Sequence, residues 1–390
     1  MFKSLLLKRC VFLPVILLTI EWGVYANQNS VPAYLIESRI EKLNLQTPIP
    51  LEYNQYVQAY IDVYTVKRPD HLAGILSRSK LYFPLFEEYL DKYGLPLELK
   101  YLAVVESALQ PQAKSSSGAY GLWQFLYQAS RMFDLKVTSY IDERADPVKS
   151  TDAACRYLKY LYNNFNDWLL AISAYNVGIG AVKEAIKQAG GEKDYWKLRP
   201  FLPVQARGYV PAFMAVNYVM NYYHSYDIKP LPETFHYDEL ATCNVKGGIS
   251  FEQISRLTGI SVEVLRFLNP VYKRDYIPVP DTGDEVSIVV PEEQLEIFNQ
   301  QRSKFFTEET PTPQKAQAYG DTTGRRKIIH IVQKGEFFHS IAMEYECRIE
   351  DLMHWNNLKD KQLYAGQRLI VWEPIEKDEE RLSFNELVQQ

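Results

Sequence analysis

The residue in this sequence best placed for acid–base chemistry is Glu106. It follows an apolar run with helical spacing over 99–105 and precedes Pro111, which cannot continue a helix. A loop of serines and glycine follows at 115–118, and Gly-Leu-Trp-Gln occupies 121–124. A lone carboxyl group at the apolar end of a helix is in a setting that raises its pKa, so that it can hold a proton near neutral pH. A surface glutamate that ends an ordinary helix would have the same local sequence.

Three separated stretches resemble a known family. They are Glu106-Ser107, Gly-Ala-Tyr-Gly-Leu-Trp-Gln at 118–124, and Ala-Tyr-Asn-Val-Gly-Ile-Gly at 174–180. Together they resemble the three-part signature of the lytic transglycosylases, lysozyme-like enzymes that cleave the glycan strands of peptidoglycan. The Trp-Gln ending of the second stretch is similar to that of the membrane-bound lytic transglycosylase D group. The resemblance extends over roughly 55–225.

The resemblance implies roles for individual residues. Glu106 would be the catalytic acid, and five further side chains would bind the substrate: Ser115, Gln124, Tyr175, Asn176 and Tyr209. Ser115 and Gln124 would hold the N-acetyl groups and the reacting sugar, and Tyr209 would hydrogen-bond Glu106 and steady its proton. Trp123 and Tyr175 could instead belong to the core, and Ser115 could be an ordinary loop serine.

The family positions in this chain supply one carboxyl group, that of Glu106. A retaining glycosidase needs a second carboxylate about 5–5.5 Å from the acid, and an inverting one needs a base roughly 6.5–9.5 Å away. We therefore expect the substrate's own C6 hydroxyl to attack the anomeric carbon, leaving a 1,6-anhydro ring on N-acetylmuramic acid. Asp142, Glu143 and Asp146 could be read as a second acid. The family, however, uses this segment, with Arg144, to fix a loop.

The elements that position Glu106 are predicted to be helices. Apolar residues recur at three- and four-residue spacing from 52 to 93 and from 153 to 165, and Asp146-Pro147 is typical of a helix start. Further helices are expected over 125–133, 168–175, 180–188 and 211–223. No strand pattern occurs before about 236. The predicted fold class is a mainly α, lysozyme-like catalytic domain followed by small α+β (βααβ) modules.

The C-terminal part repeats one plan twice. Residues 236–291 contain a pair of helical segments and a closing strand, and 328–372 predict strand, helix, helix and strand. The second copy resembles a LysM domain, a small module that binds glycans containing N-acetylglucosamine. Its usual Gly-Asp turn is Gly335-Glu336 here. The first copy lacks that turn and is interpreted as degenerate. Either copy could bind sugar or only pack on the catalytic domain.

Changes in composition predict the domain boundaries. The expected division is a signal peptide at 1–26, a helical N-terminal segment at 27–94, a transglycosylase domain at 95–230, a degenerate LysM-like module at 236–291, a linker at 300–326, a LysM domain at 327–373 and a polar tail at 374–390. Residues 27–50 are polar and contain prolines, which predicts a loose lead-in. Basic residues ahead of a short apolar run are typical of a signal peptide. The mature chain is therefore expected in the periplasm or cell envelope, associated with peptidoglycan.

Composition and motifs exclude several other classes of protein. The net charge of −5 leaves no basic footprint for nucleic acid. The cysteines beyond residue 26, Cys155, Cys243 and Cys347, show no disulfide or zinc spacing. No His-x-x-x-His or Gly-x-Ser-x-Gly motif supports a zinc peptidase or a serine hydrolase. We expect no cofactor and no metal, a monomer, and peptidoglycan glycan strands as the partner.

Three functions are compatible with these observations. The first is a lytic transglycosylase, a lyase that acts on peptidoglycan. The second is a true hydrolase of the same fold, muramidase- or chitinase-like, which a second carboxylate or a positioned water opposite Glu106 would favour. The third is a non-catalytic glycan-binding protein, and the joint presence of Glu106, Gln124 and Tyr209 argues against it.

Overall fold

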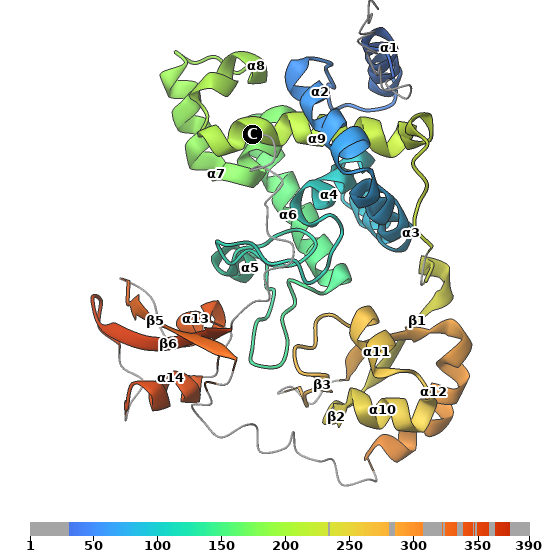
Figure 1. The fold of residues 1–390 in the computed structure, drawn as a ribbon, viewed down its shortest axis with the longest axis vertical. Coiled ribbons are helices and arrows are strands. Elements are labelled where there is room, and N and C mark those ends of the chain that lie inside the picture. Colours follow the sequence, from blue (N-terminus) through green and yellow to red (C-terminus); the bar gives the residue numbers. More distant parts are fainter. Residues whose placement is uncertain are drawn as a thin grey trace, which may run out of the picture.

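The computed structural model describes residues 31–232, 235–280, 285–306, 322, 324–333, 338–345, 347, 349–358 and 363–374. This part of the chain has three hydrophobic cores, which define a helical domain (31–232), a first module (237–306) and a second module (325–374). In Figure 1 the helical domain lies above the two modules. The expected signal peptide, most of the expected linker, the polar tail and the Gly335-Glu336 turn lie outside the described residues.

The helical domain contains nine α-helices among the described residues, joined by short irregular turns. They are α1 (Ala33–Asn44), α2 (Gln55–Asp62), α3 (Pro69–Lys92), α4 (Tyr101–Ser107), α5 (Tyr127–Met132), α6 (Pro147–Phe165), α7 (Trp168–Gln188), α8 (Tyr195–Leu198) and α9 (Tyr209–Tyr222). A π-helical turn, Val63–Lys67, follows α2, and 3₁₀ turns occupy Leu97–Lys100, Arg199–Phe201, Val204–Gly208 and Tyr223–Tyr226.

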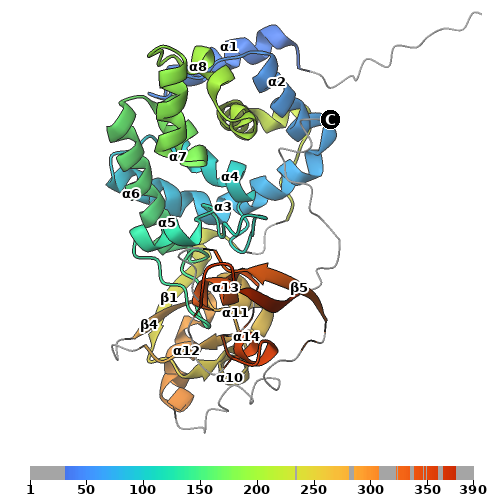
Figure 2. The same ribbon diagram turned by 90° about the vertical axis from the view of Figure 1, so that its left-hand side faces the viewer.

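Helix α9 forms the centre of the helical domain. Every residue from Tyr209 to Met220 is buried, as expected for a helix that is apolar on all sides. Helices α2, α4 and α7 all pack against it, and Figures 1 and 2 show α4 lying in the middle of the helical domain. The domain is therefore built around the two helices that carry Glu106 and Tyr209.

Helix α7 is broken where its sequence predicts. The Asn/Gly run predicts one helix ending at 175 and another beginning at 180, and the structure has two helical halves that meet in a kink at Gly178, where the backbone is not helical (φ 80°, ψ 158°). Among the described residues, α7 is the one helix long and apolar enough to cross a membrane. It packs against α6 and α9 inside this domain, which accounts for its apolar composition.

The loose lead-in predicted for 27–50 is wrong within the described residues. Helix α1 forms there, and Ile36 and Ile40 are buried in the helical core. Arg39, on the same helix, donates from Nη1 to the hydroxyl of Tyr218 at 3.1 Å. Two apolar residues four apart are enough to attach this helix, because the rest of its surface can stay polar.

The two modules share the predicted strand–helix–helix–strand plan. The first contains β1 (Leu240–Val245), β2 (Ile249–Ser250), α10 (Phe251–Thr258), α11 (Val262–Leu268), β3 (Tyr276–Ile277), β4 (Val286–Pro291) and α12 (Leu295–Gln301). The second contains β5 (Arg325–Ile331), α13 (Phe338–Glu344), α14 (Ile349–Trp355) and β6 (Arg368–Pro374). Strands β1 and β4 pair antiparallel, as do β2 with β3 and β5 with β6.

One asparagine has the same role in each module. Asn269 Nδ2 donates to the carbonyls of Leu265 and Val289, and its Oδ1 accepts from the Val289 amide. Asn356 makes the corresponding three bonds to Leu352 and Ile370. Each side chain thus joins the end of the second helix to the closing strand, which confirms the internal repeat at the level of single contacts.

The first module continues beyond the boundary predicted at 291. Helix α12 and the following 3₁₀ turn (Arg302–Phe306) bring Phe298 and Phe305 into the same core as β1 and β4, with the two rings 5.0 Å apart. The linker expected from 300 therefore begins no earlier than 307. Most residues of this segment are polar, so the sequence did not indicate that two aromatic residues seven positions apart are buried.

No disulfide joins the described cysteines. Cys155 is buried in the helical core, where burial raises the pKa of its thiol to about 12. Cys243, on β1, is buried in the core of the first module, and its thiol pKa is also raised by burial. Cys347, in the second module, is partly exposed.

Candidate active site

Helix α4 ends directly after Glu106 and Ser107, and this termination fixes where the carboxyl group points. Ala108 and Leu109 both have left-handed backbone conformations, with φ of 51° and 62°. Arg78 Nε on α3 donates to the Ala108 carbonyl at 2.9 Å. A cation at the carboxyl end of a helix is favourable, because the last carbonyls carry partial negative charge. Glu106 therefore lies at a helix end that a partly buried arginine holds in place.

Sequence reasoning missed this role of Arg78. The signal available was Gly74, one helical turn earlier on α3. A Cβ at position 74 would lie 3.3 Å from Arg78 Nη1, so the absence of a side chain leaves room for the guanidinium group.

Among the described residues, the side chain of Tyr209 hydrogen-bonds the carboxyl group of Glu106. The Tyr209 hydroxyl, at the first turn of α9, donates to Glu106 Oε1 at 2.5 Å. Burial raises the pKa of Glu106 to about 7, and the hydrogen bond from Tyr209 acts in the opposite direction, towards a lower pKa. Part of the side chain stays open to solvent. Glu106 can therefore both donate and accept a proton near neutral pH.

The Tyr209 hydrogen bond lowers the pKa of Glu106, whereas the family resemblance implied that it would hold the proton on Glu106. A hydroxyl that donates to a carboxylate favours the charged form, so it does not steady the proton on Glu106. The pKa of Tyr209 itself is raised well above 10, first by burial and then by the charge of Glu106. The tyrosine thus stays protonated and remains a donor across the neutral range.

Tyr175 and Trp123 form a second layer beside the acid. The Tyr175 hydroxyl donates to the backbone carbonyl of Trp123 at 2.8 Å, and its pKa is raised by burial and by the nearby charge of Glu106. Trp123 is fully buried, and its Nε1 donates to Thr151 Oγ1 at 2.9 Å. Trp123 is therefore a core residue, the alternative that the sequence left open, whereas Tyr175 joins that core to the surroundings of Glu106.

The chain between 113 and 125 forms a loop, here called the active-site loop, that is tied to α4. Ser107 Oγ lies 2.9 Å from the carbonyl oxygens of both Ala103 and Leu122. Gln124 has a left-handed backbone (φ 50°), and its Nε2 donates to the carbonyls of Ala113 and Gly121, each at 2.9 Å. These bonds fix the loop beside the residue that follows Glu106.

Two of the predicted substrate-binding residues have less specific surroundings. Ser115 Oγ accepts from the Ala119 amide at 3.0 Å and lies 2.9 Å from Ser117 Oγ, so this hydroxyl shapes the turn of the active-site loop. Asn176 is exposed on α7, two residues before the kink at Gly178. The structure thus brings Tyr209 into contact with Glu106, places Tyr175 near it, and gives Ser115 a bond within its own loop.

Asp142 and Arg144 fix the active-site loop from the other side, and Glu143 accepts from the Lys136 amide and pairs with Lys149. Arg144 and Asp142 form a buried pair, with Nη2 and Oδ2 2.8 Å apart, and Arg144 Nη1 donates to the carbonyls of Gly118 and Phe125 at 3.1 and 3.2 Å. A Cβ at Gly121, where φ is 91°, would lie 1.9 Å from the Arg144 carbonyl oxygen. These acids hold structure, and no carboxylate appears among the groups that shift the pKa of Glu106 in the described part of the chain.

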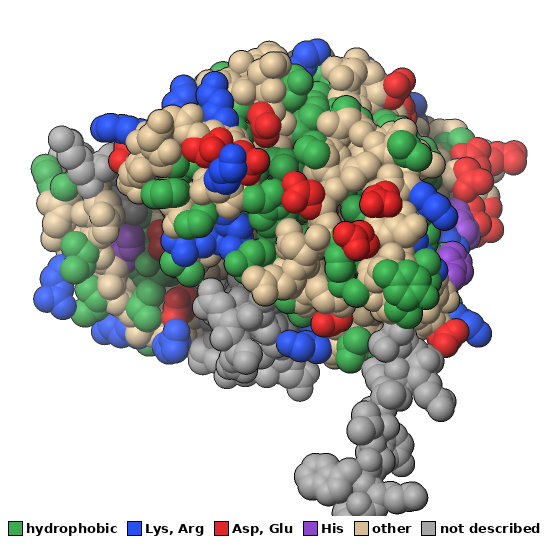
Figure 3. Space-filling view, turned by 90° about the horizontal axis from the view of Figure 1, so that it is seen from above, with side chains coloured by type: hydrophobic (Ala, Val, Ile, Leu, Met, Phe, Trp, Pro, Cys, Tyr) green, Lys and Arg blue, Asp and Glu red, His purple; other side chains and the backbone are tan. Residues whose placement is uncertain are grey.

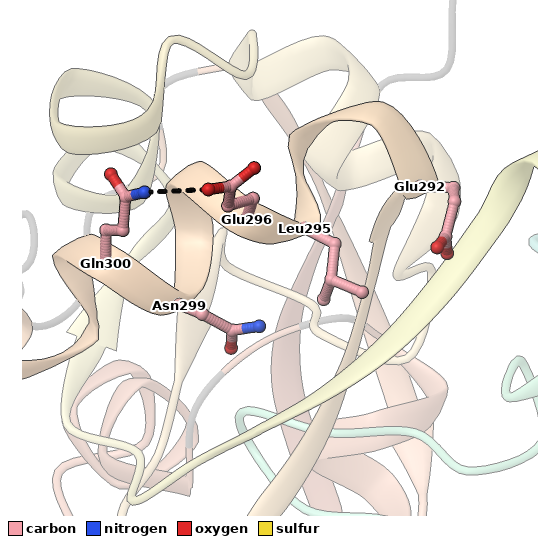
Figure 4. Close-up of a pocket in the computed structure, with 5 residues that line it drawn as sticks. All are labelled: Glu292, Leu295, Glu296, Asn299 and Gln300. Carbon is pink, nitrogen blue, oxygen red and sulfur yellow. Dashed lines mark hydrogen bonds between the residues drawn. The ribbon is translucent and has the colours of Figure 1, made fainter.

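A groove of about 600 Å³ lies elsewhere, on α12 of the first module. Figure 4 shows its lining: Glu292, Leu295, Glu296, Asn299 and Gln300. It is open to solvent. Gln300 Nε2 donates to Glu296 Oε1, one turn earlier on α12, at 3.2 Å. None of its lining residues belongs to the helical domain. Within the described ranges, no group of three His, Cys, Asp or Glu side chains is close enough to hold a metal ion.

Three family models match the chain. The transglycosylase SLT domain matches 84–198, the LysM-like domain of the lytic transglycosylase MltD matches 239–305, and the LysM domain matches 330–372. The chain carries a transglycosylase SLT domain. Two LysM-type modules follow it, and the end of the first match at 305 agrees with the burial of Phe305. The SLT match ends before Tyr209, the residue on α9 whose hydroxyl hydrogen-bonds Glu106.

Curated relatives of known name support this assignment. The membrane-bound lytic murein transglycosylase D of Escherichia coli (strain K12) is 30% identical over 310 residues, covering 78% of this chain and 66% of that protein. The soluble lytic murein transglycosylase of the same organism is 29% identical over 149 residues, covering 36% of this chain and 23% of that protein. This chain thus spans just under two thirds of the length of the first relative.

Among solved structures, the crystal structure of the 70 kDa soluble lytic transglycosylase of Escherichia coli matches 37% of this chain and 24% of that chain. The sequence identity is 28% and the TM-score is 0.32. The helical domain of the present chain contains no strand among its described residues, and α+β modules follow it, as the sequence predicts.

Proposed function

We propose that this chain is a peptidoglycan lytic transglycosylase that cleaves the MurNAc-β-1,4-GlcNAc bond without water and leaves 1,6-anhydro-MurNAc ends. One observation carries this proposal: the partner that the structure shows for the buried carboxyl group of Glu106 is the Tyr209 hydroxyl. The acids that the sequence offered as a second carboxylate are engaged elsewhere, Asp142 with Arg144 and Glu143 with Lys149.

The reaction uses Glu106 twice. Its protonated carboxyl group gives the proton to the glycosidic oxygen as the C1–O bond breaks, and GlcNAc leaves with a free 4-hydroxyl. The N-acetyl carbonyl of the substrate stabilises the positive charge at C1 of MurNAc. The C6 hydroxyl of the same sugar then attacks C1, and the Glu106 carboxylate takes its proton. The acid is regenerated and no water is consumed.

Tyr209 supports the second half of this cycle. Its hydroxyl donates to Glu106 Oε1, and this bond is stronger when Glu106 is charged. It therefore stabilises the carboxylate formed after the first proton transfer. The opposing effects of burial and Tyr209 keep the pKa near 7, where the cost of losing and of regaining the proton is similar.

We infer that the protein works on the cell wall in the periplasm, as a monomer with no cofactor. The sequence of residues 1–26 supports export, and the match of 330–372 to LysM supports attachment to glycan strands. Retention on an immobile substrate by a second binding module raises the local concentration of the catalytic domain at its target. Ser115, Gln124, Tyr175 and Asn176 are proposed to bind the glycan.

The decisive experiment is mass spectrometry of the products formed from purified peptidoglycan in ¹⁸O-labelled water. The expected product carries a 1,6-anhydro-MurNAc end and no label. Reducing-end MurNAc that contains one labelled oxygen would assign the chain to the hydrolases instead. If the protein binds peptidoglycan but produces no new glycan ends, it is a non-catalytic glycan-binding protein.

A further inference from the structure

We propose that the first LysM-type module positions the active-site loop of the helical domain through the hairpin at 136–143, and that the ring contact of Tyr140 with Tyr276 is part of this coupling. This inference rests on the proposed function, because its effect is measured on glycan cleavage. It gives the degenerate module a task other than sugar binding.

The tip of the hairpin pairs with the first module by backbone hydrogen bonds. Asp142 N donates to the Val271 carbonyl at 2.9 Å, and Lys273 N donates to the Tyr140 carbonyl at 2.8 Å. Ile141 and Tyr272 form an antiparallel bridge between these two bonds. The hairpin thus adds a short strand to the module, and Figure 1 shows it extending from the helical domain down to α11 and β3.

Side chains reinforce this backbone pairing. Ile141 packs against the core of the first module. The ring of Tyr140 lies 5.6 Å from that of Tyr276, and the guanidinium carbon of Arg274 lies 5.4 Å from the Tyr140 ring centre. Tilted aromatic pairs at this distance are attractive, and a cation over the ring adds to the attraction. The contact therefore combines a main-chain ladder with a specific cluster of rings.

The base of the same hairpin holds the active-site loop. Asp142, whose amide is bonded to the module, pairs with Arg144, and both side chains are at least 93% buried. Arg144 Nη1 in turn donates to the carbonyls of Gly118 and Phe125. One buried arginine thus links the residue that contacts the module to both ends of the segment that contains Gln124.

The last link reaches the catalytic acid. Leu122, inside that segment, accepts from Ser107 Oγ, and Ser107 is the residue next to Glu106. Hydrogen bonds joined by short stretches of the chain therefore connect Val271, in the segment before β3, through Asp142 and Arg144 to Leu122 and the end of α4. Such a path transmits a change only if one of its parts has two arrangements. The outer part of the loop, residues 114–118, is partly or fully exposed and is the part able to change, whereas Leu122 and Trp123 are buried in the core.

The test uses the full-length protein and a double-mutant cycle across the contact. Tyr140→Ala removes the ring on the helical-domain side, Tyr276→Ala removes it on the module side, and a third variant carries both changes. Neither residue belongs to the proposed catalytic or substrate-binding set. Tyr140→Phe keeps the ring pair and should retain wild-type activity. Ser139→Ala, at an exposed position beside Tyr140, is the matched control.

We expect each alanine variant to lower kcat on short soluble glycan strands by about 3- to 10-fold with little change in KM. The double variant should be no worse than the single ones, because both remove the same contact. Amide hydrogen exchange of Tyr120, Gly121 and Gln124, whose amides are bonded inside the active-site loop, should become faster. Pelleting with insoluble peptidoglycan should stay as in the wild type.

Two outcomes would overturn the inference while the proposed function stands. One is wild-type kcat and loop exchange in both alanine variants. The other is a rise in KM or weaker pelleting with unchanged kcat, which would mean that the contact serves glycan binding. Failure of the wild-type protein itself to form anhydro ends would instead contradict the proposed function.

Discussion

At the scale of single residues, the chemistry depends on a balance at one carboxyl group. Desolvation alone would keep Glu106 protonated and make it a poor base, whereas an exposed glutamate would be a poor acid at neutral pH. The hydrogen bond from Tyr209 opposes the effect of burial, and the pKa of about 7 is the result. The same balance fixes how activity and stability should vary with pH.

Replacing the acid should abolish turnover. In Glu106→Gln the amide cannot supply a proton to the leaving oxygen, so we expect a loss of roughly 10²- to 10⁴-fold or more in kcat. The rate of anhydro-end formation on purified peptidoglycan measures this. Wild-type binding to peptidoglycan should persist, and a folded variant that retains most of its activity would contradict the role of Glu106.

The same substitution should stabilise the protein at alkaline pH. The folded-state pKa of Glu106 is raised from 4.5 to about 7, so ionisation costs stability that is intact below pH 4.5 and is lost as the pH rises through 7. The shift corresponds to about 3 kcal/mol. Glu106→Gln should therefore unfold at higher denaturant concentration than the wild type at pH 8 and at a similar concentration at pH 4. Equal midpoints at pH 8 would contradict the raised pKa of Glu106.

Removal of the Tyr209 hydroxyl should move the pH profile upward. Tyr209→Phe deletes the donor that lowers the pKa of Glu106, so the acid stays protonated to higher pH and the alkaline limb of kcat/KM should shift to higher pH. The maximal rate should fall, because the carboxylate formed after proton transfer loses its partner. A limb that moves to lower pH would contradict the direction assigned to this hydrogen bond.

At the scale of elements, the active-site loop depends on close backbone approach. The Arg144 carbonyl occupies the space where a side chain at position 121 would begin. Position 121 therefore favours glycine for two reasons: its backbone has a positive φ, and there is no room for a Cβ. Gly118 shares only the first, because nothing lies within 4 Å of a Cβ placed there.

This difference gives a matched pair of variants. Gly121→Ala should destabilise the protein by about 3 kcal/mol or more, since backbone strain and a collision with Arg144 add together. Gly118→Ala should cost only about 1–2 kcal/mol, from its left-handed backbone alone. Denaturant unfolding followed by circular dichroism compares them. Equal losses would mean that the Arg144 carbonyl can move away freely.

Part of this arrangement could be predicted from the sequence. Apolar spacing and capping residues locate α6, α10 and α11, because these signals are local. Helices α1 and α12 could not be predicted in the same way, since each is attached by only one or two buried residues on an otherwise polar surface. The bond between Tyr209 and Glu106 spans 103 positions, and only the family resemblance pointed to it. No periodic pattern in the sequence indicates that the hairpin at 136–143 docks on the first module.

At the scale of the whole molecule, the described residues form three separate cores, and the proposed function assigns cleavage and attachment to different ones. Figure 3 shows acidic and basic side chains interspersed on one face of the molecule, in keeping with the net charge of −5. The helical domain contains Glu106, the first module contacts the hairpin at 136–143, and the second module matches the LysM domain model. Attachment and cleavage should therefore be separable.

Ending the chain at residue 306 tests that separation. The truncated protein keeps the helical domain and the whole core of the first module, including Phe305. We expect weaker pelleting with insoluble peptidoglycan, because the tethering module is lost, and unchanged kcat on short soluble glycans. Pelleting equal to that of the full chain would mean that the second module does not bind the wall.

The buried thiols provide a way to follow the units separately. Cys155 lies in the core of the helical domain and Cys243 in that of the first module, so neither can be alkylated until its own unit opens. With Cys347 replaced by serine, the alkylation rates of these two residues in mild denaturant report two local unfolding reactions within one molecule. Equal rates would indicate that the helical domain and the first module unfold as one cooperative unit, and Tyr140→Ala should then make Cys243 react first.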